Sequence, residues 1–295
     1  MFLALNEKVL FSTFVNHRRS GMYYLKISPS KSRFSLNIKE LYNSGELIYF
    51  FTWRDIKVKY KQTILGFLWA VLQPLLMMLI FTFFFGRVLN VPSGNLPYPV
   101  FVFAGLLLWN LFSGGITNSS NSMIANANII KKIYFPRLII PLSSILGSVF
   151  DYFMALIIFI GIMFWYQVNV SLGYFVSALI LSLLLTTLGT IGPGFLLAAL
   201  NVKYRDFRYV VPFMMQALLF ITPVIYPVNM VTNPFVKILV YINPISGAIS
   251  LIRNSLSGLA PDYTLIACST ASAFILALTG LYYFKRTESY FADLA

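Results

Sequence analysis

The amino-acid sequence predicts an all-α membrane protein with six transmembrane helices. It also predicts an N-terminal amphipathic helix at the membrane interface and re-entrant helices between the fifth and sixth spans. Hydrophobic residues make up 58% of the chain and charged residues only 11%, whereas a soluble domain is about one quarter charged. Long apolar stretches recur along the chain, and a strongly basic segment runs directly into the first of them. Such a segment is typical of a helix on the membrane surface that leads into a helix crossing it.

The charge and the cysteine content exclude several classes of protein. The net charge of +13 comes from 22 basic and 9 acidic residues. In a soluble protein this excess would indicate a nucleic-acid partner, but here the basic residues lie beside and between apolar stretches, which favours membrane lipids instead. One cysteine, Cys268, excludes an intrachain disulfide, and the single histidine, His17, argues against a metal centre built from these residue types. We therefore expect no metal, no cofactor and no nucleic acid bound to this chain.

The chain before the first span divides into two parts. Residues 1–45 mix short apolar runs with polar residues and predict a cytoplasmic leader that is partly disordered. No cleavable signal peptide is evident. Residues 46–62 predict the interface helix, in which Asp55 lies among cations. On a helix Lys59 is one turn from Asp55, so we expect these two side chains to pair.

Six apolar stretches predict the spans, at about residues 64–85, 100–116, 138–165, 172–200, 209–226 and 263–284. The first is long enough to cross a hydrocarbon core of about 30 Å. A polar loop is expected at 118–137. Residues 227–259 are apolar but interrupted by three prolines, Pro227, Pro234 and Pro244. This pattern predicts two short helices that enter and leave one leaflet, and because such backbone is tolerated only against protein or water, we expect it to line an exit. A proline-kinked seventh span is the alternative.

The basic residues predict the orientation of the chain. With six spans and the N-terminus inside, only three of the 22 basic residues fall on the outer side, namely Arg87, Lys237 and Arg253. Loops rich in lysine and arginine stay in the cytoplasm. Both termini are therefore expected to be cytoplasmic.

Few residues inside the spans could carry chemistry. Asp151 is the only acidic residue within a predicted span, and an intramembrane carboxylate is by default a functional candidate. The alternative is a structural anchor that is hydrogen-bonded to neighbouring helices. Trp69 and Tyr152 lie deeper than the aromatic residues at the span ends, and their flat rings could face sugar rings in a channel. Packing in the core or against lipid is the alternative for both.

Several motifs give the chain a family resemblance. The stretch from Arg54 to Pro74, R-D-I-K-V-K-Y-K-Q-T-I-L-G-F-L-W-A-V-L-Q-P, resembles the entry motif of polysaccharide ABC-transporter permeases of the ABC-2 type. These are the membrane subunits of O-antigen, capsule and teichoic acid exporters. Further matches follow in the family's order: I-I-K-K-I-Y-F-P-R at 129–137, N-V-K-Y-R-D-F-R at 201–208, F-I-T-P-V-I-Y at 220–226, Y-I-N-P-I at 241–245 and Y-F-A-D at 290–293. The resemblance covers about residues 41–295, and the leader is longer than the family's pattern.

The resemblance implies a transport subunit of the bacterial inner membrane rather than an enzyme. It implies a homodimer that binds two copies of a separate ATP-binding subunit, which would hold ATP and Mg²⁺. The substrate would be an undecaprenyl-linked glycan, most directly O-antigen, with teichoic acid or capsule as the near alternative. Residues that would couple to the ATPase are Arg54, Asp55, Lys57, Tyr60, Lys131, Lys132, Tyr134, Phe135, Arg205 and Asp206. Residues that would shape the outer gate are Pro227, Pro234, Tyr241 and Pro244.

Two other classes of function stay open from the residues alone. A membrane glycosyltransferase or acyltransferase would need an acid or base near the membrane face. Asp55 and Asp206 are available for that role, but each lies among cations. An ion-coupled transporter would show inverted repeats and polar groups at the midplane, where only Asp151 is ionisable. Co-purification of an ATPase subunit would argue against both.

Overall fold

The computed structural model describes residues 43–61, 66–204, 206–288 and 291, with side chains described from residue 71 onward in the second range. The predicted leader, residues 1–42, lies outside the described residues. All described residues belong to one compact unit, Leu36–Ala295. Every regular element in this described part is a helix, so the predicted all-α fold class is confirmed.

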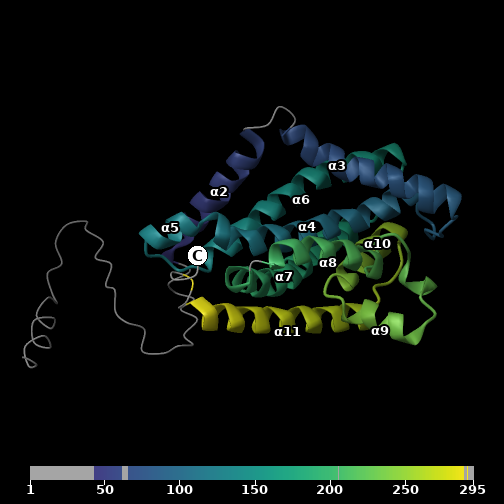
Figure 1. Cartoon of the computed structure of the whole chain (residues 1–295). Helices are drawn as coiled ribbons and strands as arrows, with labels where there is room; N and C mark the ends of the chain where they lie inside the picture. The colour runs from purple at the N-terminus through teal and green to yellow at the C-terminus, as the bar shows by residue number, and fades with distance from the viewer. Residues whose placement is uncertain (1–42, 62–65, 205, 289–290, 292–295) are drawn as a thin grey trace, which may run out of the picture. The chain divides into compact units, whose positions relative to one another are not determined.

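The helices follow one another as shown in Figure 1. Their bounds are α2 Gly45–Lys61, α3 Gly66–Phe81, the π-helix η1 Thr82–Val88, α4 Tyr98–Ala125, α5 Ala127–Lys132, α6 Ile139–Trp165, α7 Leu172–Lys203, α8 Phe207–Ile221, the 3-10 helix η2 Val228–Met230, α9 Pro234–Ile242, α10 Ser246–Ser257 and α11 Tyr263–Thr287. Figure 1 shows α5 and the end of α11 at one end of the bundle, and α9 and α10 at the opposite end. We refer to these as the α5 end and the α9 end.

Within the described part of the chain, five helices are long and apolar enough to cross a membrane. They are Val71–Val88, α4, α6, α7 and α11. The helix α8 in the predicted fifth span has 15 residues, or about 22 Å at 1.5 Å per residue, which is shorter than a core of about 30 Å. The pair α9 and α10 is apolar but bent by 91°, as a broken span or a re-entrant loop would be.

Helix α4 is longer than the sequence predicts. The polar loop expected from residue 118 continues as helix to Ala125, and three of its serines, Ser119, Ser120 and Ser122, are buried. Asn201 of α7 donates a hydrogen bond to the Ser120 carbonyl oxygen at 2.9 Å. Small polar residues commonly fill contacts between membrane helices. The polar composition here therefore reflects a helix-to-helix contact and not a loop.

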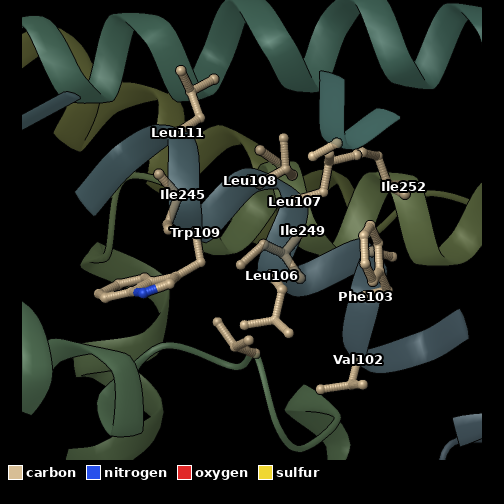
Figure 2. Packing of buried hydrophobic residues seen from close by; sticks show 14 of the residues in the cluster. Val102, Phe103, Leu106, Leu107, Leu108, Trp109, Leu111, Ile245, Ile249 and Ile252 are labelled. Atoms are coloured by element: carbon tan, nitrogen blue, oxygen red, sulfur yellow. The ribbon is translucent and has the colours of Figure 1, made fainter. Parts of the chain in front are cut away.

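Two hydrophobic clusters hold the described helices together. The larger surrounds the middle of α4 and includes residues of α6, α7, α8 and α10; Figure 2 shows part of it. The smaller lies at the α5 end and joins α2, α5, α6, α7 and α11 through aromatic rings that include Phe51, Phe195 and Phe284. Helices α7 and α11 meet at Gly192 and Gly280, where a β-carbon on either glycine would overlap the backbone of the other helix.

Candidate coupling surface and outer gate

The last turn of α2 is attached to the middle of α6 through Asp151, the acidic residue of the third predicted span. Lys59 Nζ lies 2.5 Å from Asp151 Oδ2, and the Tyr60 hydroxyl donates to Asp151 Oδ1. Both carboxylate oxygens therefore bind residues of α2. The partners of Asp151 are a lysine and a tyrosine of α2 and not side chains of the neighbouring long helices. The expected pairing of Lys59 with Asp55 is wrong, because Asp151 takes the Lys59 ammonium group.

The Tyr60 side chain is suited to hold this contact. Burial, and then the hydrogen bond to Asp151, raise the pKa of Tyr60 above its ordinary value. The phenol therefore keeps its proton and remains a donor. Its ring also lies 6.0 Å from the Phe150 ring, between centroids. A hydrogen bond to a charged acceptor and a ring contact thus fasten the end of α2.

The remaining charges of α2 are arranged on its own surface. Arg54 Nη2 lies 2.7 Å from Asp55 Oδ1, and the Arg54 guanidinium carbon lies 4.7 Å from the Phe51 ring centroid. Lys57 Nζ lies 5.3 Å from the ring centroid of Trp53, whose side chain is exposed. Arg54 thus neutralises Asp55 locally. The lysine and tryptophan pair has the character of residues found at the lipid headgroup level.

The end of α5 and the segment that follows it present two kinds of residue. Lys131, Lys132, Ile133 and Tyr134 are exposed, with Tyr134 71% exposed. Phe135 is buried, and its ring centroid lies 5.5 Å from that of Phe51. The sequence grouped Phe135 with the docking residues, but the structure makes it an anchor beneath them, because a ring in this position completes the smaller hydrophobic cluster. The sequence prediction did not include Ile133, although this residue lies between Lys132 and Tyr134.

The end of α11 braces the same segment. The Arg137 guanidinium donates to the Glu288 carbonyl oxygen, and Lys285 Nζ lies 2.8 Å from Glu288 Oε2. Phe291 is buried, with its ring centroid 5.0 Å from that of Phe284. The contact of Arg137 with Glu288 was not predicted, because no local pattern links residue 137 to residue 288. Together these contacts support the exposed residues at the end of α5 and directly after it.

The second loop at the α5 end is only partly described. Arg205 lies outside the described residues. Asp206 is exposed, precedes α8 directly and makes no capping hydrogen bond to it. Asn201 is buried, and its amide nitrogen reaches the Asn121 side-chain oxygen at 3.2 Å. Helix α7 is therefore fixed to α4 just before this loop.

At the α9 end, the prolines mark ends and corners of helices. Pro227 precedes η2, and Pro234 opens α9, where the Asn233 side chain accepts a hydrogen bond from the Phe235 amide at 2.9 Å. Pro244 lies in the corner between α9 and α10 and packs against Gly189. Proline is favoured in the first turn of a helix, whereas in the interior it removes a backbone hydrogen bond and bends the helix. This explains why the segment forms two short helices.

The aromatic residues of this end and of the predicted channel differ in exposure. Tyr241 on α9 is partly exposed, with Lys237 Nζ 5.7 Å from its ring centroid. Tyr152 is 3% exposed inside the larger cluster. Tyr152 therefore packs in the core and does not lie on a channel surface. The side chain of Trp69 lies outside the described residues.

The described residues show no metal centre: nowhere do three histidine, cysteine, aspartate or glutamate side chains lie close enough to hold a metal ion. Several ionisable groups pair with each other, with carbonyl groups or with rings, while Lys131, Lys132 and Asp206 are exposed. These arrangements are suited to joining helices and to docking partners.

Comparison with known proteins gives the family. Residues 46–256 match the model of the ABC-2 type transporter family. Two O-antigen export system permease proteins, both named RfbA and both from Klebsiella pneumoniae, are 31% and 32% identical to this chain over 262 residues, which is 88% of this chain and all of each relative. The RfbA protein of Myxococcus xanthus is 27% identical over 70% of this chain and 78% of its own length. The polysialic acid transport protein KpsM of Escherichia coli is 23% identical over 68% of this chain and 78% of its own.

The matched region contains the entry motif, α5 with the segment after it, and the bent pair α9 and α10. The resemblance seen in the sequence motifs is confirmed, and the chain belongs to the ABC-2 type transporter family as a membrane-spanning permease.

Proposed function

We propose that this chain is the permease of an exporter that moves undecaprenyl-linked O-antigen across the bacterial inner membrane. Two copies form the pathway, and two copies of a separate ATP-binding subunit drive it. The observation that carries the proposal is the extent of the match: both Klebsiella pneumoniae permeases named for O-antigen export align over their whole length. Each part of those permeases therefore has a counterpart in this chain.

The energy source lies outside this chain in the proposal. The sequence has no G-x-x-x-x-G-K-[ST] motif, the loop with which many ATPases cradle phosphate. ATP and Mg²⁺ would be bound by the partner subunit. This chain contributes the surface that receives the partner's motion.

The exposed residues at the end of α5 and directly after it are the proposed docking surface for that subunit. Lys131, Lys132, Ile133 and Tyr134 project from a segment that Phe135 anchors in the smaller cluster. Two cations beside an apolar and an aromatic side chain fit a partner groove with an acidic rim and an apolar floor. Asp206 and Arg205 would brace the neighbouring loop.

Helix α2 carries the motion further. Arg54, Asp55 and Lys57 would contact the ATPase or anionic lipid, while Lys59 and Tyr60 hold Asp151 on α6. A displacement of α2 therefore reaches a long helix directly. This is the mechanical path from the partner to the spans in the proposal.

The orientation follows from the described cations. The α5 end carries the cations of α2, of α5 and of the end of α11, whereas the α9 end has only Arg87, Lys237 and Arg253 among the described residues. The rule that basic loops stay inside supports a cytoplasmic α5 end. The α9 end would then face outward, and the bent pair, with Pro227, Pro234, Tyr241 and Pro244, would form the outer gate.

Capsular polysaccharide is the second candidate substrate, because the matched KpsM protein is named for polysialic acid transport. Its identity of 23% is below the 31% of an RfbA relative. Teichoic acid is a further alternative that the motifs left open.

The test is deletion of the gene followed by complementation. We expect O-antigen to disappear from the cell surface while lipid-linked glycan accumulates inside, with both effects reversed by the restored gene. Loss of capsule with normal surface O-antigen would instead support the second candidate. Normal amounts of both polysaccharides at the surface would contradict the proposed function. Co-purification with an ATP-binding subunit checks the energy source independently.

A further inference from the structure

Arg253 on α10 is a buried cation held by carbonyl groups. Its side chain is 7% exposed, and no salt bridge involves it within the part of the chain that the structure describes. Its guanidinium donates to the carbonyl oxygens of Pro223 and Val224, each at 2.6 Å, and of Phe101 at 3.1 Å. The guanidinium carbon also lies 3.5 Å from the Phe101 ring centroid. A planar group with several donors can make all these contacts at once.

The acceptors of Arg253 belong to a stretch that has left the helical conformation. The chain from Thr222 to Tyr226 follows α8 without forming a helix, so its carbonyl groups need partners inside a membrane protein. Arg253 supplies donors for three of them, those of Pro223, Val224 and, at 3.5 Å, Tyr226. The Tyr98 hydroxyl of α4 donates to the Ile225 carbonyl oxygen at 2.8 Å. The Asn243 amide, in the corner between α9 and α10, donates to the Thr222 hydroxyl at 2.7 Å.

Helix α4 is shaped to admit Arg253. A β-carbon at Gly105 would lie 2.7 Å from Arg253 Nη2 and 3.1 Å from the Val224 carbonyl oxygen. Only glycine leaves this room. Close by, Ile245, Ile249 and Ile252 lie in the same hydrophobic cluster as residues of α4, as Figure 2 shows. Hydrogen bonds and apolar packing thus join α10 to α4.

The two halves of the bent pair differ in how firmly they are held. Nine residues of α10 are buried, whereas Val240 alone is buried in α9. At Gly247, α10 also meets α11 so closely that a β-carbon would lie 2.8 Å from Ile266 Cα. Most of α9 is exposed, including Phe235 and Ile238. The 91° bend between the halves is a natural boundary for movement.

We propose that Arg253 locks α10 to α4 and to the stretch 222–226, so that opening of the outer gate moves α9 alone. This inference rests on the proposed function, in which the α9 end is the exit. Arg253 is a positioning residue: it acts through the backbone it holds and does not touch the glycan. Displacing α10 would strip the carbonyl groups of Pro223, Val224 and Phe101 of their donor together, whereas α9 can move with the loss of few contacts.

Hydrogen–deuterium exchange of the whole complex, in lipid nanodiscs with its ATPase subunit, tests the inference. During ATP turnover we expect faster exchange in peptides from 234–242 and unchanged exchange in peptides from 246–257 and 222–226. An equal rise of the exchange rate in 234–242 and 246–257 would overturn the inference, but the proposed place of the gate at the α9 end would stand. If neither peptide responds while export proceeds, the exit lies elsewhere, and the proposed gate fails with the inference.

Variants test the residue itself. Arg253→Met should raise exchange in 246–257 and 222–226 at least tenfold, and Arg253→Lys should do the same, because one ammonium group cannot reproduce the planar fork. Lys237→Met is the matched control: it removes an exposed cation from α9 and should leave α10 unchanged. Wild-type exchange in 246–257 of Arg253→Met would refute the assignment. If that variant does not assemble, the comparison of the two wild-type peptides decides the question. Tyr98→Phe adds a second test, because it removes only the hydrogen-bond donor to the Ile225 carbonyl oxygen.

Discussion

The attachment of α2 to α6 makes the sharpest prediction. Asp151→Ala removes the ion pair with Lys59, whose side chain is 51% exposed, and exposed pairs contribute about 0.2–1 kcal/mol. It also removes the acceptor of the Tyr60 hydroxyl, and hydrogen bonds to charged groups contribute about 1.5–3 kcal/mol. The attachment should weaken by roughly 2–4 kcal/mol. Because each 1.4 kcal/mol is a factor of ten, the population of the state in which the end of α2 is detached from α6 should rise about 30-fold or more.

The loss should be local, because Phe51 still holds the other part of α2 in the smaller cluster. A spin label at Val58, which is 57% exposed, reports on the released end. In Asp151→Ala we expect a more mobile label, ATP hydrolysis at half or more of the wild-type rate, and export reduced about tenfold. The measurements are electron paramagnetic resonance, ATPase activity and glycan export in one reconstituted complex.

Single substitutions separate the two contacts. Tyr60→Phe should have most of the effect of Asp151→Ala, and Lys59→Met a small part of it, in line with the magnitudes above. Lys61→Met removes an exposed cation at the end of α2 that has no contact with Asp151 and should behave as wild type. The reasoning is refuted if Asp151→Ala leaves both the label at Val58 and export unchanged.

Further outcomes are expected at other sites. Tyr134→Ala should weaken ATPase-subunit binding about tenfold, or about 1.4 kcal/mol, without loss of folding, whereas Phe135→Ala should destabilise the permease by about 3–5 kcal/mol; binding and thermal unfolding distinguish the two. Gly192→Val should prevent stable expression, because its β-carbon would overlap the α11 backbone, and normal yield would contradict this packing. A cysteine at Leu239, in a Cys268→Ser background, should be labelled from the outer side only, and a reporter fused at Ala295 should be active only in the cytoplasm.

Long apolar helices could be predicted from the sequence because length and hydropathy are local signals. Helices α6, α7 and α11 coincide with long, predominantly apolar segments, and the structure finds each long enough to span. The break at Pro244 could also be foreseen, because three prolines interrupt this apolar stretch and each removes a backbone hydrogen-bond donor. These features depend on residues close in the chain.

The extension of α4 could not be predicted in this way. Ser119 and Ser120 have the composition of a loop, and only their burial against α6 and α7 makes them helical contacts. The same limit applies to Lys59, for which the local i,i+4 rule favoured Asp55. The structure pairs it with Asp151, which is 92 residues away in the chain. A side chain such as Lys59 can pair with a local or a distant partner, and the sequence alone does not show which of the two pairs is more stable.

Asp151 and Arg253 are held in opposite ways, and this difference bears on how the permease works. Asp151 pairs with side chains of a helix outside the spans, and its side chain is 28% exposed. Its attachment of roughly 2–4 kcal/mol is weak enough to break and reform when a partner moves α2. Arg253 is buried among carbonyl groups of two segments, α4 and the stretch 222–226, and removing one side of such an arrangement leaves a charge without compensation. The contact between α2 and α6 is therefore the one that can respond to a partner, and the α9 end has the fixed frame against which a short helix can move.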